Sequence, residues 1–154
     1  MQFGGRYLFA APRPLVWAAL NDAGVLQAAI PGCRRLEWSG PDQLAIEIAV
    51  SLGPVRPTFS GDLTLSNVRP AQSYRLEGRG RGGLLGLAHG GADIVLADQP
   101  EGTELRFLAE GGASGRIMQL GRSLVGSSAQ GIIDGFFARF AQAMGTEITV
   151  LAPA

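Results

Sequence analysis

The side chains that most often carry catalytic or metal chemistry are scarce in this chain. It has one histidine, His89, and one cysteine, Cys33. A single histidine and a single cysteine cannot form the four-ligand set of a cysteine–histidine zinc site, and one cysteine cannot close a disulfide within the chain. We therefore expect no metal centre, no covalently bound cofactor and a fold that does not depend on oxidation.

His89 is the residue best suited to act as a general base, with Cys33, Asp93 and Ser114 as conceivable neighbours. Its position in the sequence argues against that role. In the alternating pattern of its segment His89 shares the register of Asp93, so it faces solvent unless a glycine bulge turns it inward. We interpret His89 as a surface histidine and Cys33 as a small buried thiol, and we name no catalytic residue.

A glycine-rich run from Gly78 to Gly83 matches the pattern G-x-G-x-x-G, which in a dinucleotide-binding fold cradles a pyrophosphate at the start of a helix. That chemistry requires the helix, but residues 84–96 have the pattern of a turn and a strand. The 13 basic and 13 acidic side chains also cancel, so no overall field attracts nucleic acid. We interpret the run as a hairpin connection and expect no nucleotide site and no nucleic-acid partner.

Hydrophobic periodicity predicts the elements that position these residues. Two short helices are predicted at residues 14–20 and 23–29, the second capped by Asn21-Asp22, and Ile30-Pro31-Gly32 ends the helical pair. A strand pattern begins at Arg34. A first strand is predicted at residues 3–10. Alternation of apolar and polar residues then predicts one long antiparallel meander, whose clearest strands are residues 43–52, 59–66, 74–80, 88–96 and 103–109.

The inward-facing row of these strands becomes small in the later part of the sheet. The small inward residues are Gly61, Gly78, Gly80, Ala88, Gly90, Ala92 and Ala109. Charged residues fall on the alternate phase, so the interior of the sheet is apolar. This interior is either partly hollow or wrapped tightly around a helix, because glycine serves both purposes. The residues do not distinguish the two alternatives.

The last apolar segment, residues 116–144, predicts a long amphipathic helix. Its apolar stripe comprises Met118, Val125, Ala129, Ile132, Phe136, Phe140 and Ala143, and the polar residues Ser123, Ser127, Gln130 and Asp134 fall on the other side. Each glycine inside a helix lowers its stability by roughly 1 kcal/mol relative to alanine. Because Gly121, Gly131 and Gly135 flank the stripe, either another backbone approaches there or space is left for a ligand.

Several short motifs carry a resemblance to a known family. They are Ala11-Pro12-Arg13, the run from Val16 to Asp22, Leu26, Ile30-Pro31-Gly32-Cys33, Gly53-Pro54-Val55, Phe59-Ser60-Gly61, the run from Gly86 to Gly90, Thr103-Glu104-Leu105 and the stretch from Gly121 to Phe137. With these motifs the chain resembles the carbon monoxide dehydrogenase CoxG family of the START-like (SRPBCC) helix-grip superfamily. The resemblance implies an α+β helix-grip fold. In that fold a curved antiparallel sheet of about seven strands has two short helices after its first strand and a long C-terminal helix packed across it.

The same resemblance implies an accessory protein rather than a catalyst. Family members are typically encoded beside molybdenum hydroxylases such as carbon monoxide dehydrogenase, and they are linked to enzyme maturation, membrane attachment or quinone carriage. We therefore expect a non-catalytic pocket for a quinone- or lipid-like molecule. The alternatives are an adaptor or maturation factor that docks on the molybdenum hydroxylase without a ligand, and a START-like cyclase or hydrolase.

Two sets of residues are assigned to these roles. The set expected to dock on the enzyme is Trp17, Ile30, Pro31 and Gly32. The set expected to line the cavity is Ile48, Val50, Phe59, Tyr74, Leu76, Ile94, Phe107, Gly121, Leu124, Val125, Gly131, Gly135 and Phe136.

The length and the hydrophobic pattern bound the domain organisation. A chain of 154 residues has the length of one domain, which we place at residues 1–150. Residues 151–154 are expected to be a short end without the membrane-anchoring extension of many family members. No run reaches the roughly 18 apolar residues of a membrane span, so we expect no stable membrane insertion and a cytoplasmic location. The sequence leaves open whether the protein forms a homodimer.

Overall fold

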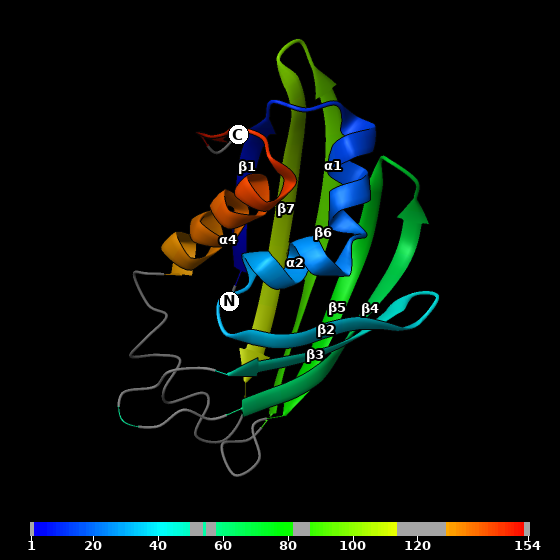
Figure 1. Ribbon diagram of the computed structural model, residues 1–154, viewed down its shortest axis with the longest axis vertical. Coiled ribbons are helices and arrows are strands. Elements are labelled where there is room, and N and C mark those ends of the chain that lie inside the picture. The colour runs from blue at the N-terminus through cyan, green and yellow to red at the C-terminus, as the bar shows by residue number, and fades with distance from the viewer. Residues whose placement is uncertain (1, 50–53, 55–57, 82–86, 114–128, 153–154) are drawn as a thin grey trace.

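The computed structural model describes residues 2–49, 54, 58–81, 87–113 and 129–152. These residues form strands and helices in the order β1 (Gln2–Phe9), α1 (Arg13–Leu20), α2 (Ala23–Ala29), β2 (Cys33–Gly40), β3 (Gln43–Ala49), β4 (Thr58–Arg69), β5 (Ser73–Arg81), β6 (Leu87–Gln99), β7 (Gly102–Ala113), α4 (Ala129–Met144) and β8 (Ile148–Leu151) (Figure 1).

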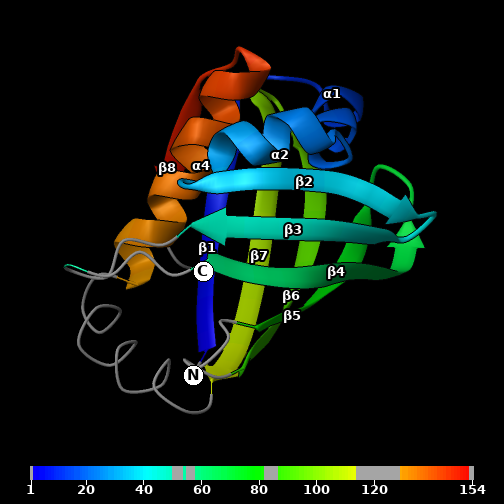
Figure 2. The same ribbon diagram turned by 60° about the horizontal axis from the view of Figure 1, so that its bottom comes forward.

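The strands of the described residues form one antiparallel sheet of eight strands, in the order β2-β3-β4-β5-β6-β7-β1-β8. Figure 1 shows α1, α2 and α4 on one face of this sheet, and Figure 2 shows the sheet curving around them. The predicted helix-grip fold is confirmed. The prediction of about seven strands omitted β8, a strand of four residues that pairs with β1 at the edge of the sheet.

Cross-strand pairing brings the predicted inward residues together. Leu63 of β4 pairs with Leu44 of β3 on one side and with Gly78 of β5 on the other. Gly78 pairs in turn with Gly90 of β6. Because directly paired residues project to the same face of a sheet, these four residues form one inward row, as the alternation of the sequence predicts.

The most closely packed aromatic layer lies between β1 and α4. The ring of Tyr7 stacks on Phe137 with a centroid distance of 4.4 Å, and Phe9 meets Phe140 edge-on at 5.7 Å. All four side chains are buried. Burying a phenylalanine side chain contributes about 1.5–3 kcal/mol, so this layer anchors the last helix to the first strand.

The buried side of α4 differs from the predicted apolar stripe. Phe140 is buried as expected, but Phe137 and Ala141 complete the buried side, whereas Ala143 is exposed. The difference arises because α4 packs against α2 as well as β1, so its surroundings are not a single flat sheet. The first part of the predicted helix falls within residues 114–128, which lie outside the described residues.

Two hydrogen bonds tie α4 to its neighbours. The Tyr7 hydroxyl donates to Oδ1 of Asp134 at 2.5 Å, and Nε of Arg139 donates to the carbonyl oxygen of Ala29, the last residue of α2, at 3.0 Å. Asp134 therefore faces β1 and not the polar side where it was predicted. Gly135 lies beside the Arg139 side chain, where a Cβ would meet its Nη1 atom at an ordinary contact distance of 3.4 Å.

The residues from Ile30 to Gly32 form a tight turn between α2 and β2. Gly32 has a φ angle of +73°, and a Cβ there would collide with the carbonyl oxygen of Ala49. The Ala49 N–H also donates to the carbonyl oxygen of Gly32 at 2.8 Å. Only glycine fits this position, so this motif has a structural role in joining the helical pair to the end of β3.

On the outward face, Glu104 of β7 is only 2% exposed because arginine side chains cover it. Its Oε1 atom accepts hydrogen bonds from Nε of Arg6 at 2.9 Å and from Nε of Arg106 at 2.6 Å. Its Oε2 atom accepts one from Nε2 of Gln99 at 3.1 Å. The hydrogen bond from Arg6, followed by that from Arg106, lowers the pKa of Glu104 from 4.5 to about 2.

We expect Glu104 to make the folded protein sensitive to acid. Its pKa is lower in the folded chain than in the unfolded chain, so it contributes stability above pH 4.5 that is lost as the pH falls toward about 2. Urea unfolding across this pH window measures the effect. Glu104→Gln should lower the free energy of unfolding at neutral pH by about 1–3 kcal/mol and flatten its dependence on acid pH. The exposed Glu101→Gln is the control, and an unchanged pH dependence in Glu104→Gln would contradict the assignment.

Candidate functional site

The middle of the sheet has an inward face with almost no side chains. Gly61 of β4 pairs with Gly80 of β5, and Gly78 of β5 pairs with Gly90 of β6. Gly90 pairs in turn with Gly111 of β7. Neighbouring glycines on four strands leave the peptide backbone bare on the side that faces the helices.

This bare backbone forms the floor of an apolar pocket of about 400 Å³. The walls are aliphatic and aromatic side chains of the inward register: Ile46 and Ile48 of β3, Phe59 and Leu63 of β4, Leu76 of β5, Ala92 of β6 and Ala109 of β7. Residues of outward register that also border the pocket include Ser60, Arg79, His89 and Glu110. The volume falls within the range of about 300–1,000 Å³ that is typical of small-molecule sites. The pocket is therefore large enough for a small apolar molecule.

The structure places the predicted cavity residues in two layers of the interior. Those that border the pocket are Ile48, Phe59 and Leu76. Those that lie in the packed core are Tyr74, Ile94 and Phe107, which pair directly across β5, β6 and β7 and are buried there. The pocket therefore occupies only part of the predicted interior.

The remaining predicted cavity residues lie in α4 or outside the described residues. Phe136 is half-buried and its ring stacks on Phe140 at 6.2 Å. Gly135 lies beside the Arg139 side chain, and Gly131 is in the first turn of α4. The predicted residues Val50, Gly121, Leu124 and Val125 lie outside the described residues.

A row of packed aromatic and aliphatic residues closes one end of the pocket. In this row the Tyr74 ring meets Trp17 of α1 edge-on at 5.5 Å, and the Phe107 ring lies 5.3 Å from Phe137. Burial raises the pKa of Tyr74, so its hydroxyl stays neutral at physiological pH. Trp17, which was predicted to dock on a partner, is half-buried and lies beside this closed end.

Besides the glycines, the predicted set omitted four apolar residues that border the pocket, Ile46, Leu63, Ala92 and Ala109. Alternation already placed each of them on the inward face. The sequence pattern does not show where along a strand the interior changes from packed to hollow, because that boundary depends on which rows of neighbouring strands meet.

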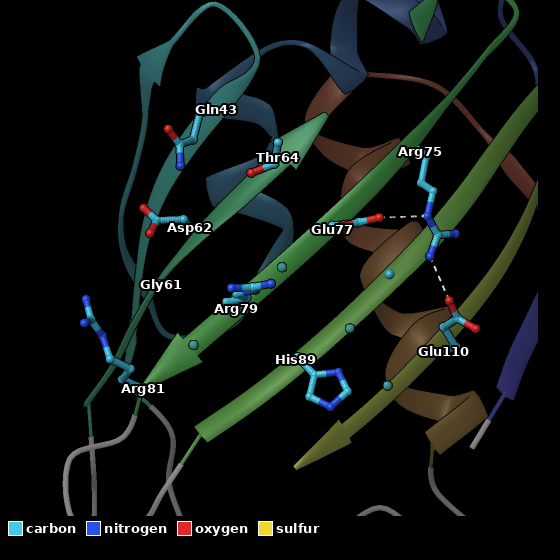
Figure 3. A pocket seen from close by; sticks show the side chains of 15 residues that line it. Gln43, Gly61, Asp62, Thr64, Arg75, Glu77, Arg79, Arg81, His89 and Glu110 are labelled. Atoms are coloured by element: carbon cyan, nitrogen blue, oxygen red, sulfur yellow. Dashed lines mark hydrogen bonds and ion pairs between the residues drawn. The ribbon is translucent and has the colours of Figure 1, made fainter. Parts of the chain in front are cut away.

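The opposite face of the same glycine-rich region has a groove of about 1200 Å³ (Figure 3). The side chains that line it are polar or charged: Gln43, Asp62, Thr64, Arg75, Glu77, Arg79, Arg81, His89 and Glu110. Figure 3 shows them on the outward side of the sheet, with the last helix behind it. Because Gly61, Gly78, Gly80 and Gly90 border both spaces, a single layer of backbone separates the charged groove from the apolar pocket.

Arg75 links three strands across this outward face. It donates to Glu77 of its own strand at 3.2 Å, to Asp93 of β6 at 3.0 Å and to Glu110 of β7 at 2.7 Å. Gly91 makes this reach possible, since a Cβ there would lie 2.6 Å from Nη2 of Arg75. These hydrogen bonds, first that to Glu110, raise the pKa of Arg75.

The groove offers charge but not an arrangement suited to acid–base catalysis. His89 is exposed, which confirms its predicted outward register, and its direct cross-strand neighbours are Arg79 and Gly112. Neither can orient an imidazole as a carboxylate would. Burial raises the pKa of the half-buried Cys33 thiol, which does not favour a nucleophilic thiolate. In the part of the chain that the structure describes, no group of three or more His, Cys, Asp or Glu could hold a metal ion.

The order of elements and the curved sheet define a START-like helix-grip protein, and solved structures share this fold over nearly the whole chain. A conserved protein from Geobacillus kaustophilus is similar with a TM-score of 0.81 at 22% identity, over 96% of this chain and 99% of that one. A protein from Rhizobium leguminosarum has a TM-score of 0.71 at 11% identity, over 94% and 93% of the two chains. A protein from Chromobacterium violaceum has a TM-score of 0.70 at 14% identity, over 92% and 95%. Identities this low show the fold alone.

The family model of the carbon monoxide dehydrogenase protein CoxG matches residues 5–145, and the chain belongs to this family. Membership suggests an accessory protein associated with carbon monoxide dehydrogenase. No curated protein matches the sequence. None of the helices among the described residues has the length and apolar character needed to span a bilayer.

We expect Arg75 to stabilise the glycine-rich part of the sheet electrostatically. Arg75→Met keeps an apolar side chain of similar length but leaves Glu77, Asp93 and Glu110 without their shared cation. The urea midpoint should fall, and the fall should shrink as salt is raised to about 1 M, where the screening length is about 3 Å. Arg34→Met, at an exposed position of the edge strand β2, is the control. A fall in the midpoint that salt does not change would argue against an electrostatic role.

Proposed function

We propose that this protein is a non-catalytic binding or carrier protein for a hydrophobic small molecule, quinone- or lipid-like, held between the sheet and the C-terminal helix. It would serve a molybdenum hydroxylase of the carbon monoxide dehydrogenase type. The observation that carries the proposal is the apolar pocket on the helix-facing side of the sheet. Membership of the CoxG family supports the link to the enzyme.

The separation of charge between the two faces of the sheet favours an apolar ligand. The charged side chains of this region project into the outward groove, whereas the pocket walls are Ile, Leu, Phe and Ala. A polar group that entered the pocket would lose its hydrogen bonds to water, and these walls would not replace them. That loss costs roughly 2–7 kcal/mol per group, so the pocket selects against polar ligands.

The expected affinity suits a carrier rather than a permanent cofactor. Burying about ten methylene groups contributes on the order of 8 kcal/mol, at roughly 0.8 kcal/mol each. Ordering a flexible ligand and restricting its motion offsets part of this gain. A micromolar, exchangeable complex is the natural outcome.

Filling the pocket should abolish binding. Ala92 of β6 borders the pocket, so Ala92→Phe would place a ring inside it. Val95→Phe places the same ring on the same strand but at an outward, exposed position, and it is the matched control. We expect wild type and Val95→Phe to bind alike, and Ala92→Phe to lose more than about tenfold in affinity.

Two measurements test this expectation. Native mass spectrometry with solvent extraction identifies any apolar molecule that copurifies with the protein. Quenching of tryptophan fluorescence by added quinone reports binding, because Trp17 lies beside the closed end of the pocket. If wild-type protein carries no apolar molecule and quinone does not quench its tryptophans, the proposed function is wrong.

A second function, as an adaptor on the molybdenum hydroxylase, is favoured by exposed apolar groups on the helical pair. Leu15 of α1 is 58% exposed, and Pro31 in the turn after α2 is also exposed. Large exposed apolar side chains can mark an interaction surface. Ile30, also assigned to docking, packs partly against the core, so Leu15 offers the cleaner test.

Leu15→Glu should weaken co-purification with the co-expressed enzyme, because it places a charge in the expected contact, while quinone quenching stays unchanged. Val150→Glu, at a position 57% exposed on β8, is the control and should copurify as wild type does. Undiminished co-purification of Leu15→Glu would count against docking through α1.

A further inference from the structure

The glycines that border the pocket differ in what a side chain at their position would meet. A Cβ on Gly61 would collide with the carbonyl oxygen of Arg79, and a Cβ on Gly90 would lie 3.1 Å from the carbonyl oxygen of Glu110. Both contacts are with the backbone of the neighbouring strand, which cannot move without disturbing the hydrogen-bonded ladder. The close pairing of strands therefore accounts for these two glycines.

Gly80 has no such explanation in the sheet. Among the described residues, the nearest atom to a Cβ at this position is the carbonyl oxygen of Ser60, at 3.9 Å, which is an ordinary van der Waals contact. Its φ angle is not among the positive values, so the backbone conformation does not require glycine. The sheet would accept a side chain at Gly80, and its absence leaves volume to the pocket that Gly80 borders.

The pocket becomes broader along the strands as the inward side chains become smaller. Beyond the packed row that contains Tyr74, the next inward row has Leu76 and Ala92, and the following row has Gly78 and Gly90. Gly80 lies one row further. Leu76 and Gly80 are four residue steps apart, about 13 Å at 3.3 Å per residue, and over this distance the inward side chains of β5 shrink from leucine to glycine.

We propose that Gly80 sets the width of the group that the pocket admits, and that the ligand's broadest apolar part, a ring system rather than an unbranched chain, lies over Gly78, Gly80 and Gly90. This inference rests on the proposed function. Bare peptide groups offer a ring a flat surface, and no side chain at these positions competes for the space. A narrower hydrocarbon part would extend toward Leu76 and Ala92.

Two probes of different width test the assignment. Aminoanthracene is a flat molecule of three fused rings, and decanol is a slim chain. Gly80→Leu projects a side chain into the broad part of the pocket, whereas Arg81→Leu adds the same side chain at the next residue, which is exposed and in the outward register. Fluorescence titration gives the affinity for aminoanthracene, titration calorimetry gives that for decanol, and thermal unfolding reports the integrity of each variant.

We expect Gly80→Leu to weaken aminoanthracene binding by more than about tenfold and decanol binding by less than about threefold, with Arg81→Leu like wild type. Gly80→Ala, whose methyl group meets only an ordinary contact, should weaken aminoanthracene binding by about twofold to tenfold. This second variant keeps the test decisive if Gly80→Leu does not fold.

The outcomes separate this inference from the proposed function. Unchanged aminoanthracene affinity in both Gly80 variants, or equal losses for the two probes, would overturn the role of Gly80. A wild-type protein that binds decanol but not aminoanthracene would overturn the inference alone. A wild-type protein that binds neither probe would overturn the proposed function and this inference together.

Discussion

The close approach of neighbouring strands at the glycine-rich middle of the sheet is the constraint on which the rest of the structure depends. The carbonyl oxygen of Arg79 occupies the space that a Cβ of Gly61 would need, so the two strands meet there only because position 61 has no side chain. The same absence of side chains bares the inward face of the sheet. At Gly61 strand pairing and the pocket thus have one origin, and a larger residue there would disturb both.

A sheet without inward side chains gains little hydrophobic stabilisation at that place, so its stability must come from elsewhere. Two features outside the pocket supply it. The aromatic layer that includes Tyr7 and Phe137 fastens α4 to β1, and Arg75 joins β5, β6 and β7 through their outward carboxylates. The charged face is therefore not merely a solvated surface, because it supports the strands from the side opposite the pocket.

Alternation in the sequence predicted the strands, their inward faces and the outward position of His89, because side-chain direction in a strand has a strict period of two. It could not decide between a hollow interior and a tightly wrapped one. The structure gives the two kinds of glycine different surroundings: a Cβ on Gly61 would collide with the neighbouring strand, whereas a Cβ on Gly80 would meet only an ordinary contact among the described residues. The reach of Arg75 over Gly91 and the contact of Tyr7 with Asp134 also escaped prediction, because each joins residues that only the folded sheet and helix bring together. Strand β8 was missed because four residues are too few for a reliable alternation.

The position of β1 between β7 and β8 also has a kinetic consequence. Phe9 pairs with Thr103 and with Ile148, so the first strand to leave the ribosome finds its partners only after most of the chain has been made. The strands that wall the pocket, β3 to β6, are sequential neighbours and can pair early. Such long-range closure slows folding and leaves an unpaired strand edge exposed in the meantime. The strands that line the apolar pocket can therefore pair before α4 has a strand to pack against.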